Sequence, residues 1–325
     1  MIDETGAWHG EGTDEGRTLT PEQNKLVTDS WHRAQQGRAE LDRKLVGIEE
    51  SHATRGGRLE GLEYSLKGLD SLRRKVAKSA MRGVPVEELL EQNNDLHRYT
   101  LTFPTAEYTA ATEQVYGQLR EQGYRPVPGS EKNTWEDPVY KGLNTTWENP
   151  DRGEKFELQF HTPDSFRAKM DNHELYELAR SDQFKQRFND PELEKSYLAA
   201  TDILQNERYE NVAIPPGVER LGERKIRVAL DHSLDPAIVE NVRRFESEVR
   251  AENEAKAAAA KPSAPAEAEV SEDLTELLQD DGPSLRDRIQ PPGALPAQRT
   301  DAPAPTLGEA PLPGIDQGRP KGRRL

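Results

Sequence analysis

Two alternating stretches joined by a turn constrain the fold of this chain more than any other feature. Residues 140–147 read YKGLNTTW, residues 149–153 read NPDRG, and residues 155–162 read KFELQFHT. Alternation of apolar and polar residues on both sides of a turn sequence predicts a β-hairpin. The polar face of the second strand is either an ordinary solvated surface or the floor of an active site. Four residues define that face: Lys155, Glu157, Gln159 and His161.

Helical patterns surround this hairpin on both sides. Residues 20–23 (TPEQ) have a threonine suited to an N-cap, a proline at the first helical position and a glutamine where a capping box needs one. A long polar helix to about residue 52 is therefore expected. Residues 95–103 (DLHRYTLTF) alternate like a further strand. The other predicted helices cover residues 59–66, 70–80, 85–92, 105–122, a segment opening at Pro163, 191–208 and 235–258. This order predicts an α+β fold with a small mixed or antiparallel sheet flanked by helices.

Composition decides how much of the chain can form a core. Hydrophobic residues make up 33% of the 325 positions and the mean hydropathy is −0.92, so part of the length must be solvated helix or disordered tail. The Pro/Ala/Glu-rich tail is a candidate docking segment for a protein partner, and a solvated tail is the alternative. The expected segments are a disordered N-terminus (1–19), a long polar helix (20–55), a strand-containing domain (56–210), a loop and helix (211–258) and a disordered tail (259–325).

Several classes of function are excluded or disfavoured by what the sequence lacks. The chain has no cysteine, which excludes disulfides, thiol catalysis and cysteine-based zinc sites. It has no GxxxxGK[ST] or GxGxxG motif, so the usual phosphate-binding loops are not expected. No secretory signal and no run of about 18 apolar residues is found, so a cytoplasmic protein without a membrane partner is expected. The net charge of −15 disfavours general coating of nucleic acid.

Two carboxylates on the predicted strands are candidates for a metal site. Asp95 opens the strand at 95–103, and Glu157 lies in the middle of the second hairpin strand. If these strands are neighbours, both side chains can face one cleft. Mg²⁺ is commonly held by one or two carboxylates together with substrate phosphates. The alternative interpretation is that both carboxylates are solvated.

Cationic residues supply candidates for contacts with an anionic substrate. Lys67, Ser71 and Lys75 are spaced by four residues, which places them on one helical face, with Arg74 close by. Two lysines and a hydroxyl in line suit a polyphosphate, and a solvated charged face is the alternative. Lys132 lies in a predicted loop before the hairpin, where an exposed loop lysine is again the alternative.

An aromatic residue at the start of the hairpin is a candidate for base stacking. Tyr140 precedes Gly142 by two residues, and a glycine lets other atoms approach the backbone closely. The tyrosine ring can therefore be presented to a base. A packed core aromatic is the alternative interpretation.

Taken in order, these motifs resemble those of the synthetase domain of the RelA/SpoT homologue family. The resemblance runs from about residue 60 to residue 180, and it makes the segment 56–210 similar to a synthetase domain. The matching blocks are KGLDSLRRK with Lys67, Ser71 and Lys75, DLHRYTLTF with Asp95 and Arg98, the loop residue Lys132, VYKGLNT at 139–145, and ELQFHT at 157–162. The last two are similar to the family's Gly-Tyr-x-Ser-x-His-Thr and Glu-x-Gln-x-Arg-Thr strands. The chain thus resembles a small, divergent, single-domain member.

The resemblance implies a nucleotidyltransferase-like fold and the transfer of pyrophosphate from ATP to the 3′-hydroxyl of a guanine nucleotide, GDP or GTP. It implies that Asp95 and Glu157 bind Mg²⁺ and that Glu157 also activates the acceptor hydroxyl. The implied ATP and phosphate contacts are Lys67, Ser71, Arg74, Lys75 and Arg98. The implied acceptor contacts are Lys132, Tyr140, Asn144, Gln159 and His161.

Departures from the family pattern lie around the nucleotide pockets. Ser65 stands where the family has an arginine two residues before the first lysine, Asn144 replaces a histidine, and His161 replaces an arginine. Two alternatives therefore stay open. One is a toxin that makes adenine alarmones or pyrophosphorylates the tRNA 3′ end. The other is a non-catalytic nucleotide-binding or scaffold protein.

Overall fold

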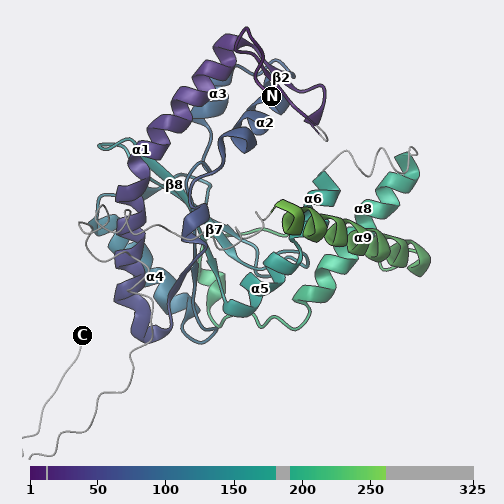
Figure 1. Cartoon of the computed structure of the whole chain (residues 1–325). Coiled ribbons are helices and arrows are strands. Elements are labelled where there is room, and N and C mark those ends of the chain that lie inside the picture. Colours follow the sequence, from purple (N-terminus) through teal and green to yellow (C-terminus); the bar gives the residue numbers. More distant parts are fainter. Residues whose placement is uncertain (12–13, 181–190, 261–325) are drawn as a thin grey trace, which may run out of the picture. The chain divides into compact units, whose positions relative to one another are not determined.

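A seven-stranded mixed sheet organises the part of the chain that the computed structural model describes, residues 1–11, 14–180 and 191–260 (Figure 1). The strand order is β3-β4-β8-β7-β6-β9, and β5 also pairs with β7. The predicted hairpin is present as the antiparallel pair β7 and β8, and the predicted α+β class is confirmed. The strands are β3 (Arg58–Glu60), β4 (Arg98–Thr102), β5 (Arg125–Pro126), β6 (Lys132–Asn133), β7 (Leu143–Asn149), β8 (Glu154–His161) and β9 (Glu223–Arg224).

The register of the central strands gathers polar residues on one face of the sheet. β4 runs parallel to β8 and places Arg98 opposite Glu157. β7 runs antiparallel to β8 and places Asn144 opposite Gln159, while β6 places Lys132 opposite Asn144. Because side chains directly opposite each other in neighbouring strands share a face, the polar face of β8 continues onto strands on both sides.

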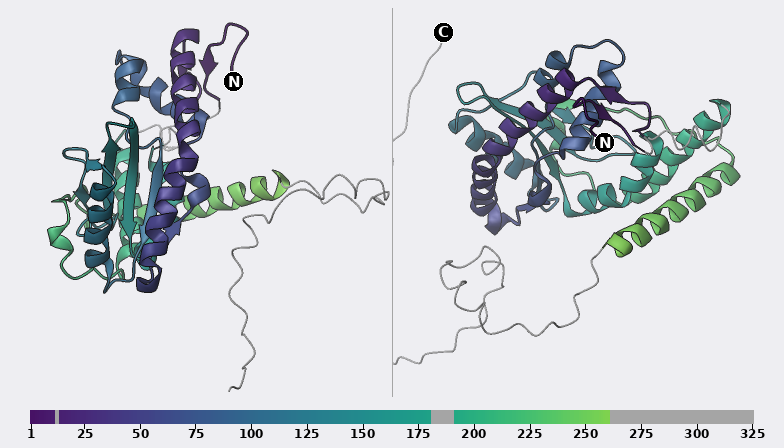
Figure 2. Two further views of the ribbon diagram at one scale, coloured as in Figure 1. Left: turned by 90° about the vertical axis from the view of Figure 1, so that its left-hand side faces the viewer. Right: turned by 45° about the horizontal axis from the view of Figure 1, so that its top comes forward.

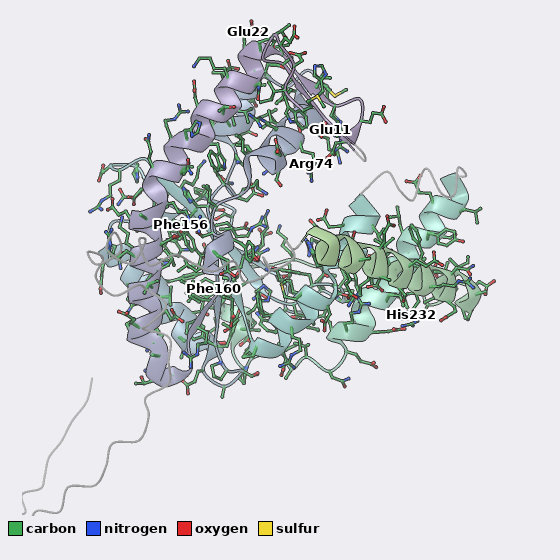
Figure 3. The ribbon with its side chains drawn as sticks, in the orientation of Figure 1. Glu11, Glu22, Arg74, Phe156, Phe160 and His232 are labelled. Atoms are coloured by element: carbon green, nitrogen blue, oxygen red, sulfur yellow. The ribbon has the colours of Figure 1, made fainter. Side chains whose placement is uncertain are left out.

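The opposite face of the sheet forms the main hydrophobic core. Phe156, Leu158 and Phe160 of β8 have no exposed surface and pack in one cluster with residues of α1 (Pro21–His52) and α4 (Tyr108–Glu121). Figure 2 shows α1 running along the sheet, and Figure 3 labels the two phenylalanines on β8. Full burial of such side chains stabilises the fold by about 1.5–3 kcal/mol each. The apolar residues of β8 therefore determine which face of the strand packs against the core and which face carries the polar residues.

The N-terminal part of the chain contains one confirmed and one wrong prediction. Helix α1 begins at the predicted capping box, in which Thr20 and Gln23 each accept a hydrogen bond from the other's backbone N–H. Residues 1–19 were predicted to be disordered, but this segment contains β1 (Trp8–His9) and β2 (Thr18–Leu19), which pair antiparallel. Its two buried apolar side chains pack with α1 and with α2 (Leu69–Ala80). Two such residues are too few to produce a periodic signal in the sequence.

A second correction concerns residues 59–66, which were predicted to be helical. They form β3 and a 3₁₀ turn at Leu62–Tyr64 instead. Gly61 between the two elements has a φ of +62°, a left-handed conformation that ends the strand. β3 is an edge strand that pairs antiparallel with β4. The predicted helix at 85–92 is α3 (Val86–Glu91).

Within the described residues, four α-helices follow strand β8 along the chain. They are α5 (Pro163–Asp171), α6 (His173–Arg180), α8 (Pro191–Tyr209) and α9 (Pro236–Ala260), and α6, α8 and α9 share a second hydrophobic cluster. No described helix is both long and apolar enough to span a membrane. The predicted disordered tail lies outside the described residues from position 261 onward, and the predicted internal boundaries at 55 and 210 stay predictions.

Replacing Leu158 with alanine should lower the free energy of unfolding by about 2–5 kcal/mol, because the change leaves a cavity between the sheet and its helices. Leu193→Ala is the matched control, since that leucine on α8 is 42% exposed. The control should change stability by no more than about 0.5 kcal/mol. Urea unfolding followed by circular dichroism measures both, and equal losses in the two variants would contradict the placement of Leu158 in the core.

Candidate active site

One guanidinium group joins the two carboxylates that the sequence singles out. Arg98 donates from Nε to Oε2 of Glu157 at 2.5 Å and from Nη2 to Oδ2 of Asp95 at 3.1 Å. The parallel pairing of β4 with β8 produces this arrangement, because it places Arg98 directly opposite Glu157. The metal-site hypothesis required these two strands to be neighbours, and they are. The side chains of Asp95 and Glu157 are only 19% and 15% exposed.

Two lysines complete a cationic shell around Asp95. Lys75 Nζ lies 2.6 Å from Oδ1, and Lys67 Nζ lies 3.2 Å from Oδ2. Burial on its own would raise the pKa of Asp95, but the hydrogen bond from Lys75 and the charges of Lys67, Lys75 and Arg98 outweigh it and lower that pKa. Asp95 is therefore held as an anion.

The spacing of the two lysines predicted that both lie on one face of a single helix. In the structure only Lys75 lies on a helix, and Lys67 contacts Asp95 from the segment before that helix. Lys75 lies on α2, whereas Lys67 precedes the helix and donates its backbone N–H to the carbonyl of Leu96 at 2.9 Å. The Trp31 indole of α1 donates to the Lys67 carbonyl at 2.7 Å. Burial lowers the pKa of Lys67, and the charge of Asp95 opposes that shift.

The carboxylates of Asp95 and Glu157 line a cleft with a volume of about 320 Å³. The polar face of the sheet forms its floor, and the loop at 127–130, which sequence reasoning missed, forms one wall. The lining of the cleft contains three cationic side chains and two carboxylates, whereas the whole chain has a net charge of −15. The cleft therefore suits an anionic ligand. The lining residues are Lys75, Gln92, Asn94, Asp95, Arg98, Val127, Pro128, Gly129, Ser130, Lys132, Asn144, Thr145, Thr146 and Glu157.

Tyr140, Asn144 and His161 form one hydrogen-bonded group beside this cleft. The Tyr140 hydroxyl donates to Asn144 Oδ1 at 2.9 Å and lies 3.1 Å from His161 Nε2. His161 Nδ1 lies 3.1 Å from the Lys141 carbonyl and 3.0 Å from Ser165 Oγ. His161 has no exposed surface, so it orients Tyr140 and does not itself reach the cleft. Burial, together with the charge of Lys169, lowers the pKa of His161 well below its usual value and keeps the ring neutral.

Two of the predicted phosphate contacts, Arg74 and Ser71, are not among the residues that line the cleft. Arg74 on α2 pairs with Asp14 of the N-terminal segment and lies beside that segment in Figure 3. Ser71 lies exposed on the same helix. Arg74 precedes Lys75 by one residue, and one residue along a helix turns the side chain by about 100°. Lys132, predicted in a loop, lies on the short strand β6 and lines the cleft.

Two further cations near the site were not found by sequence reasoning. The Arg227 guanidinium lies 5.3 Å from the centroid of the Tyr140 ring, over the aromatic group that was predicted to stack on a base. Lys169 of α5 donates to Gln159 Oε1 at 2.6 Å. Lys169 follows Ser165 by four residues, so the two side chains lie on the same face of α5. This spacing was the one feature of the sequence that could have indicated Lys169. Arg227 gave no signal, because it lies far outside the motif blocks.

The donor set of the site fits a Mg²⁺ ion. Asp95 and Glu157 both contact one guanidinium, and carboxylate oxygens are ligands that Mg²⁺ commonly takes. Within the described residues, no group of three or more His, Asp or Glu side chains is arranged to hold a metal. The protein would therefore supply two carboxylates, with water and ligand oxygens completing the coordination, as is usual for Mg²⁺.

Comparisons with known proteins find similarity among solved structures. No protein-family model and no curated protein matches the chain. Small alarmone synthetase 1 from Bacillus subtilis is 18% identical with a TM-score of 0.36, and the match covers 56% of this chain and 93% of that one. The same synthetase bound to its product pppGpp is 18% identical with a TM-score of 0.34, covering 57% and 100%. A GTP pyrophosphokinase family protein from Streptococcus pneumoniae is 18% identical with a TM-score of 0.36, covering 59% and 91%. The chain is structurally similar to these proteins and divergent from them in sequence.

Alanine at position 142 should destabilise the protein and disrupt the contact between Tyr140 and His161. The added Cβ would lie 2.6 Å from Cε1 of the buried His161 ring, and overpacking of this kind costs about 1–3 kcal/mol. Gly117→Ala is the matched control, because nothing lies within 4 Å of its added Cβ and alanine favours helix α4 by about 1 kcal/mol. Urea unfolding should show opposite signs for the two variants, and a Gly142→Ala protein as stable as the wild type would contradict the packing.

Acidification should destabilise the fold partly through His161. Its pKa is lowered in the folded protein, so below about pH 6.5 the unfolded chain takes up a proton that the folded chain does not. Stability is lost as the pH falls through this range, by up to about 1.4 kcal/mol per pH unit for one proton. His97, whose pKa burial also lowers, adds to the slope. Urea unfolding between about pH 5 and 6.5 should show a shallower slope for His161→Gln.

The control for this measurement is His232→Gln, since His232 is exposed and lies far from the site (Figure 3). That variant should keep the slope of the wild type. If His161→Gln kept it as well, the buried neutral state of His161 would be wrong.

Proposed function

We propose that this protein is an ATP-dependent nucleotide 3′-pyrophosphokinase that transfers the terminal pyrophosphoryl group of ATP to the 3′-hydroxyl of a purine nucleotide. The observation that carries the proposal is the pair Asp95 and Glu157, joined by Arg98 on the floor of a cationic cleft. In the motif order that resembles the RelA/SpoT synthetase domain, these two carboxylates occupy the metal-binding and hydroxyl-activating positions.

The proposed reaction moves one group and one proton. The acceptor's 3′-oxygen bonds to the β-phosphorus of ATP, the bond from that phosphorus to the α–β bridging oxygen breaks, and AMP leaves. The hydroxyl proton passes to a carboxylate, for which Glu157 is the candidate because it lies in the cleft and accepts bonds from Arg98 and Gln159. Phosphoryl transfer of this kind depends mainly on positioning and charge stabilisation, and both are what this site offers.

The cations of the site are suited to a polyphosphate. Lys67, Lys75 and Arg98 each pair with Asp95, and phosphate oxygens are equivalent partners for all three. Mg²⁺, held by Asp95 and Glu157, would supply further neutralisation of phosphate charge when bound. A ligand would therefore exchange existing ion pairs for new ones, and the amount of buried unpaired charge would stay small.

The acceptor is proposed to lie on the side of the cleft formed by β6 and β7. Lys132 lies opposite Asn144 in the register, and Asn144 accepts the hydrogen bond that holds Tyr140. This arrangement offers one cation for acceptor phosphates and one aromatic ring for the base. GDP or GTP is the proposed acceptor, from the resemblance, and an adenine nucleotide or the tRNA 3′ end are the alternatives.

Incubation with γ-labelled ATP, Mg²⁺ and a panel of GDP, GTP, AMP, ADP, ATP and uncharged tRNA should transfer label to GDP or GTP and release AMP. Glu157→Gln and Asp95→Asn should each lower the rate by at least about 100-fold, because charge stabilisation of the transition state is usually a large term. Glu148→Gln is the control: this carboxylate lies on the neighbouring strand β7 and pairs with Arg125 outside the cleft lining. It should retain wild-type activity.

The outcomes of this assay separate the alternatives. Label on tRNA or on adenine nucleotides alone would favour the toxin. Nucleotide binding by calorimetry without any transfer would favour a non-catalytic binding protein. Full activity in both carboxylate variants would show that the site is wrong even if the reaction is right.

A further inference from the structure

We propose that Lys169 is a positioning residue for Glu157: it orients the side chain of Gln159, which in turn holds the carboxylate. This inference rests on the proposed function, in which Glu157 is the reacting carboxylate. Lys169 lies on α5, outside every motif block by which the chain resembles the RelA/SpoT synthetases. Its role would therefore be specific to the way this chain builds its catalytic floor.

A continuous line of hydrogen bonds connects Lys169 with Glu157. Lys169 Nζ donates to Gln159 Oε1 at 2.6 Å, and Gln159 Nε2 donates to Glu157 Oε1 at 3.1 Å. Arg98 holds the other carboxylate oxygen, Oε2, at 2.5 Å. Both oxygens of Glu157 are thus fixed, one directly by a cation and the other through the amide.

The chemistry of the three groups favours one orientation of the amide. An amide side chain can present either its carbonyl oxygen or its NH₂ group to a neighbour, whereas an ammonium group only donates. Lys169 therefore turns the carbonyl oxygen of Gln159 toward itself and the NH₂ group toward Glu157. Glu157 only accepts and so favours the same orientation; without the ammonium group the amide loses one of the two partners that hold it in place. Thr100 Oγ1 lies 3.5 Å from the same carbonyl oxygen, a distance too long to replace the lysine.

The surroundings keep Lys169 close to the floor of the cleft. Gln159 is 5% exposed, so its amide is largely shielded from solvent. Burial and the charge of Arg98 lower the pKa of Lys169 to about 8, and the charge of Glu157 opposes this shift. The ammonium form, which the orientation requires, still predominates at neutral pH.

The start of α5 is positioned next to β8 by the residues at its N-terminus. The helix begins directly after β8, at a capping box formed by Thr162 and Ser165. Ser165 lies 3.0 Å from the His161 ring, and Lys169, one turn further on, reaches Gln159. The first half of α5 is therefore tied to the polar face of β8.

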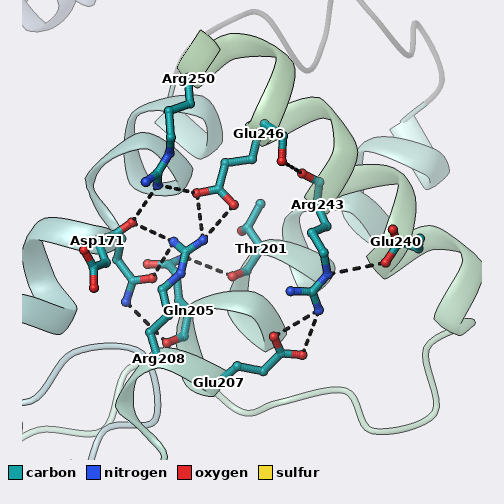
Figure 4. Close-up of polar contacts among 11 residues, drawn as sticks. Asp171, Thr201, Gln205, Glu207, Arg208, Glu240, Arg243, Glu246 and Arg250 are labelled. Carbon is teal, nitrogen blue, oxygen red and sulfur yellow. Dashed lines mark hydrogen bonds and ion pairs between the residues drawn. The ribbon is translucent and has the colours of Figure 1, made fainter. Parts of the chain in front are cut away.

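The far end of α5 is fixed by helices outside the motif blocks (Figure 4). Arg208 of α8 donates to the Asp171 carbonyl at 2.7 Å and to Asn172 Oδ1 at 3.0 Å. The same guanidinium donates to both carboxylate oxygens of Glu246 on α9, each at 2.8 Å. Glu246 is 4% exposed, both bonds come from Nη2 of Arg208, and charge-assisted hydrogen bonds are stronger than neutral ones. The position of Lys169 is therefore held from both ends of its helix.

A double-mutant cycle tests whether Lys169 acts through Gln159. Lys169→Met should lower kcat for pyrophosphoryl transfer by up to about 100-fold, the cost of a displaced catalytic group, with a smaller change in KM for ATP. Lys169→Arg, which keeps a donor, should restore part of the rate. In a Gln159→Met background the same Lys169→Met change should have little further effect, because the connection is already broken.

Arg167→Met on the same helix is the control, since its side chain is 72% exposed. Additive losses would instead mean that Lys169 acts on the substrate directly and would overturn the proposal.

A second measurement does not depend on activity. The side-chain NH₂ resonances of Gln159, identified by their loss in Gln159→Met, should exchange slowly with water in the wild type. They should shift and exchange faster in Lys169→Met but not in Arg167→Met. Unchanged resonances in Lys169→Met would overturn the proposal, and so would a shifted resonance with unchanged kcat. If the wild type transfers no pyrophosphate to any acceptor, the proposed function fails, while this spectrum still decides whether Lys169 orients Gln159.

Discussion

The Arg98 guanidinium holds together two carboxylates that would otherwise repel each other in a partly buried cleft. Its position follows from the register of two parallel strands, β4 and β8, which places Arg98 opposite Glu157. A shift of this register by one residue would turn the phenylalanines of β8 toward the cleft and the polar residues into the core. Burial of Phe156 and Phe160 therefore excludes registers shifted by one residue, and so keeps the polar residues of β8 on the face of the cleft.

The floor of the cleft combines residues that act on a ligand with residues that orient their neighbours. Lys75, Arg98 and Lys132 line the cleft. His161 has no exposed surface and holds Tyr140 instead. Burial keeps the His161 ring neutral, so an anionic ligand depends on the cations that line the cleft.

Three hydrophobic clusters support the site from different directions. The main cluster lies beneath the sheet and sets the floor. The N-terminal cluster packs β1 and β2 against α1 and α2, and α2 carries Lys75. The C-terminal cluster packs α6, α8 and α9, and the ion pair between Arg208 and Glu246 connects two of these helices to the end of α5. Segments outside the motif blocks thus help to position residues at the cleft.

The sequence by itself determined the features that depend on neighbours along the chain. The alternation of β8, the hairpin turn and the capping box of α1 are local, and each was predicted from its own residues. The hypothesis that Asp95 and Glu157 face one cleft depended on their strands being neighbours, and the pairing of β4 with β8 meets that condition. Only the tertiary structure decided the partners of individual side chains, such as Arg74 with Asp14 and Lys169 with Gln159. Such pairs join segments whose separation in space depends on the packing of the whole sheet and its helices, and no local periodicity encodes that distance.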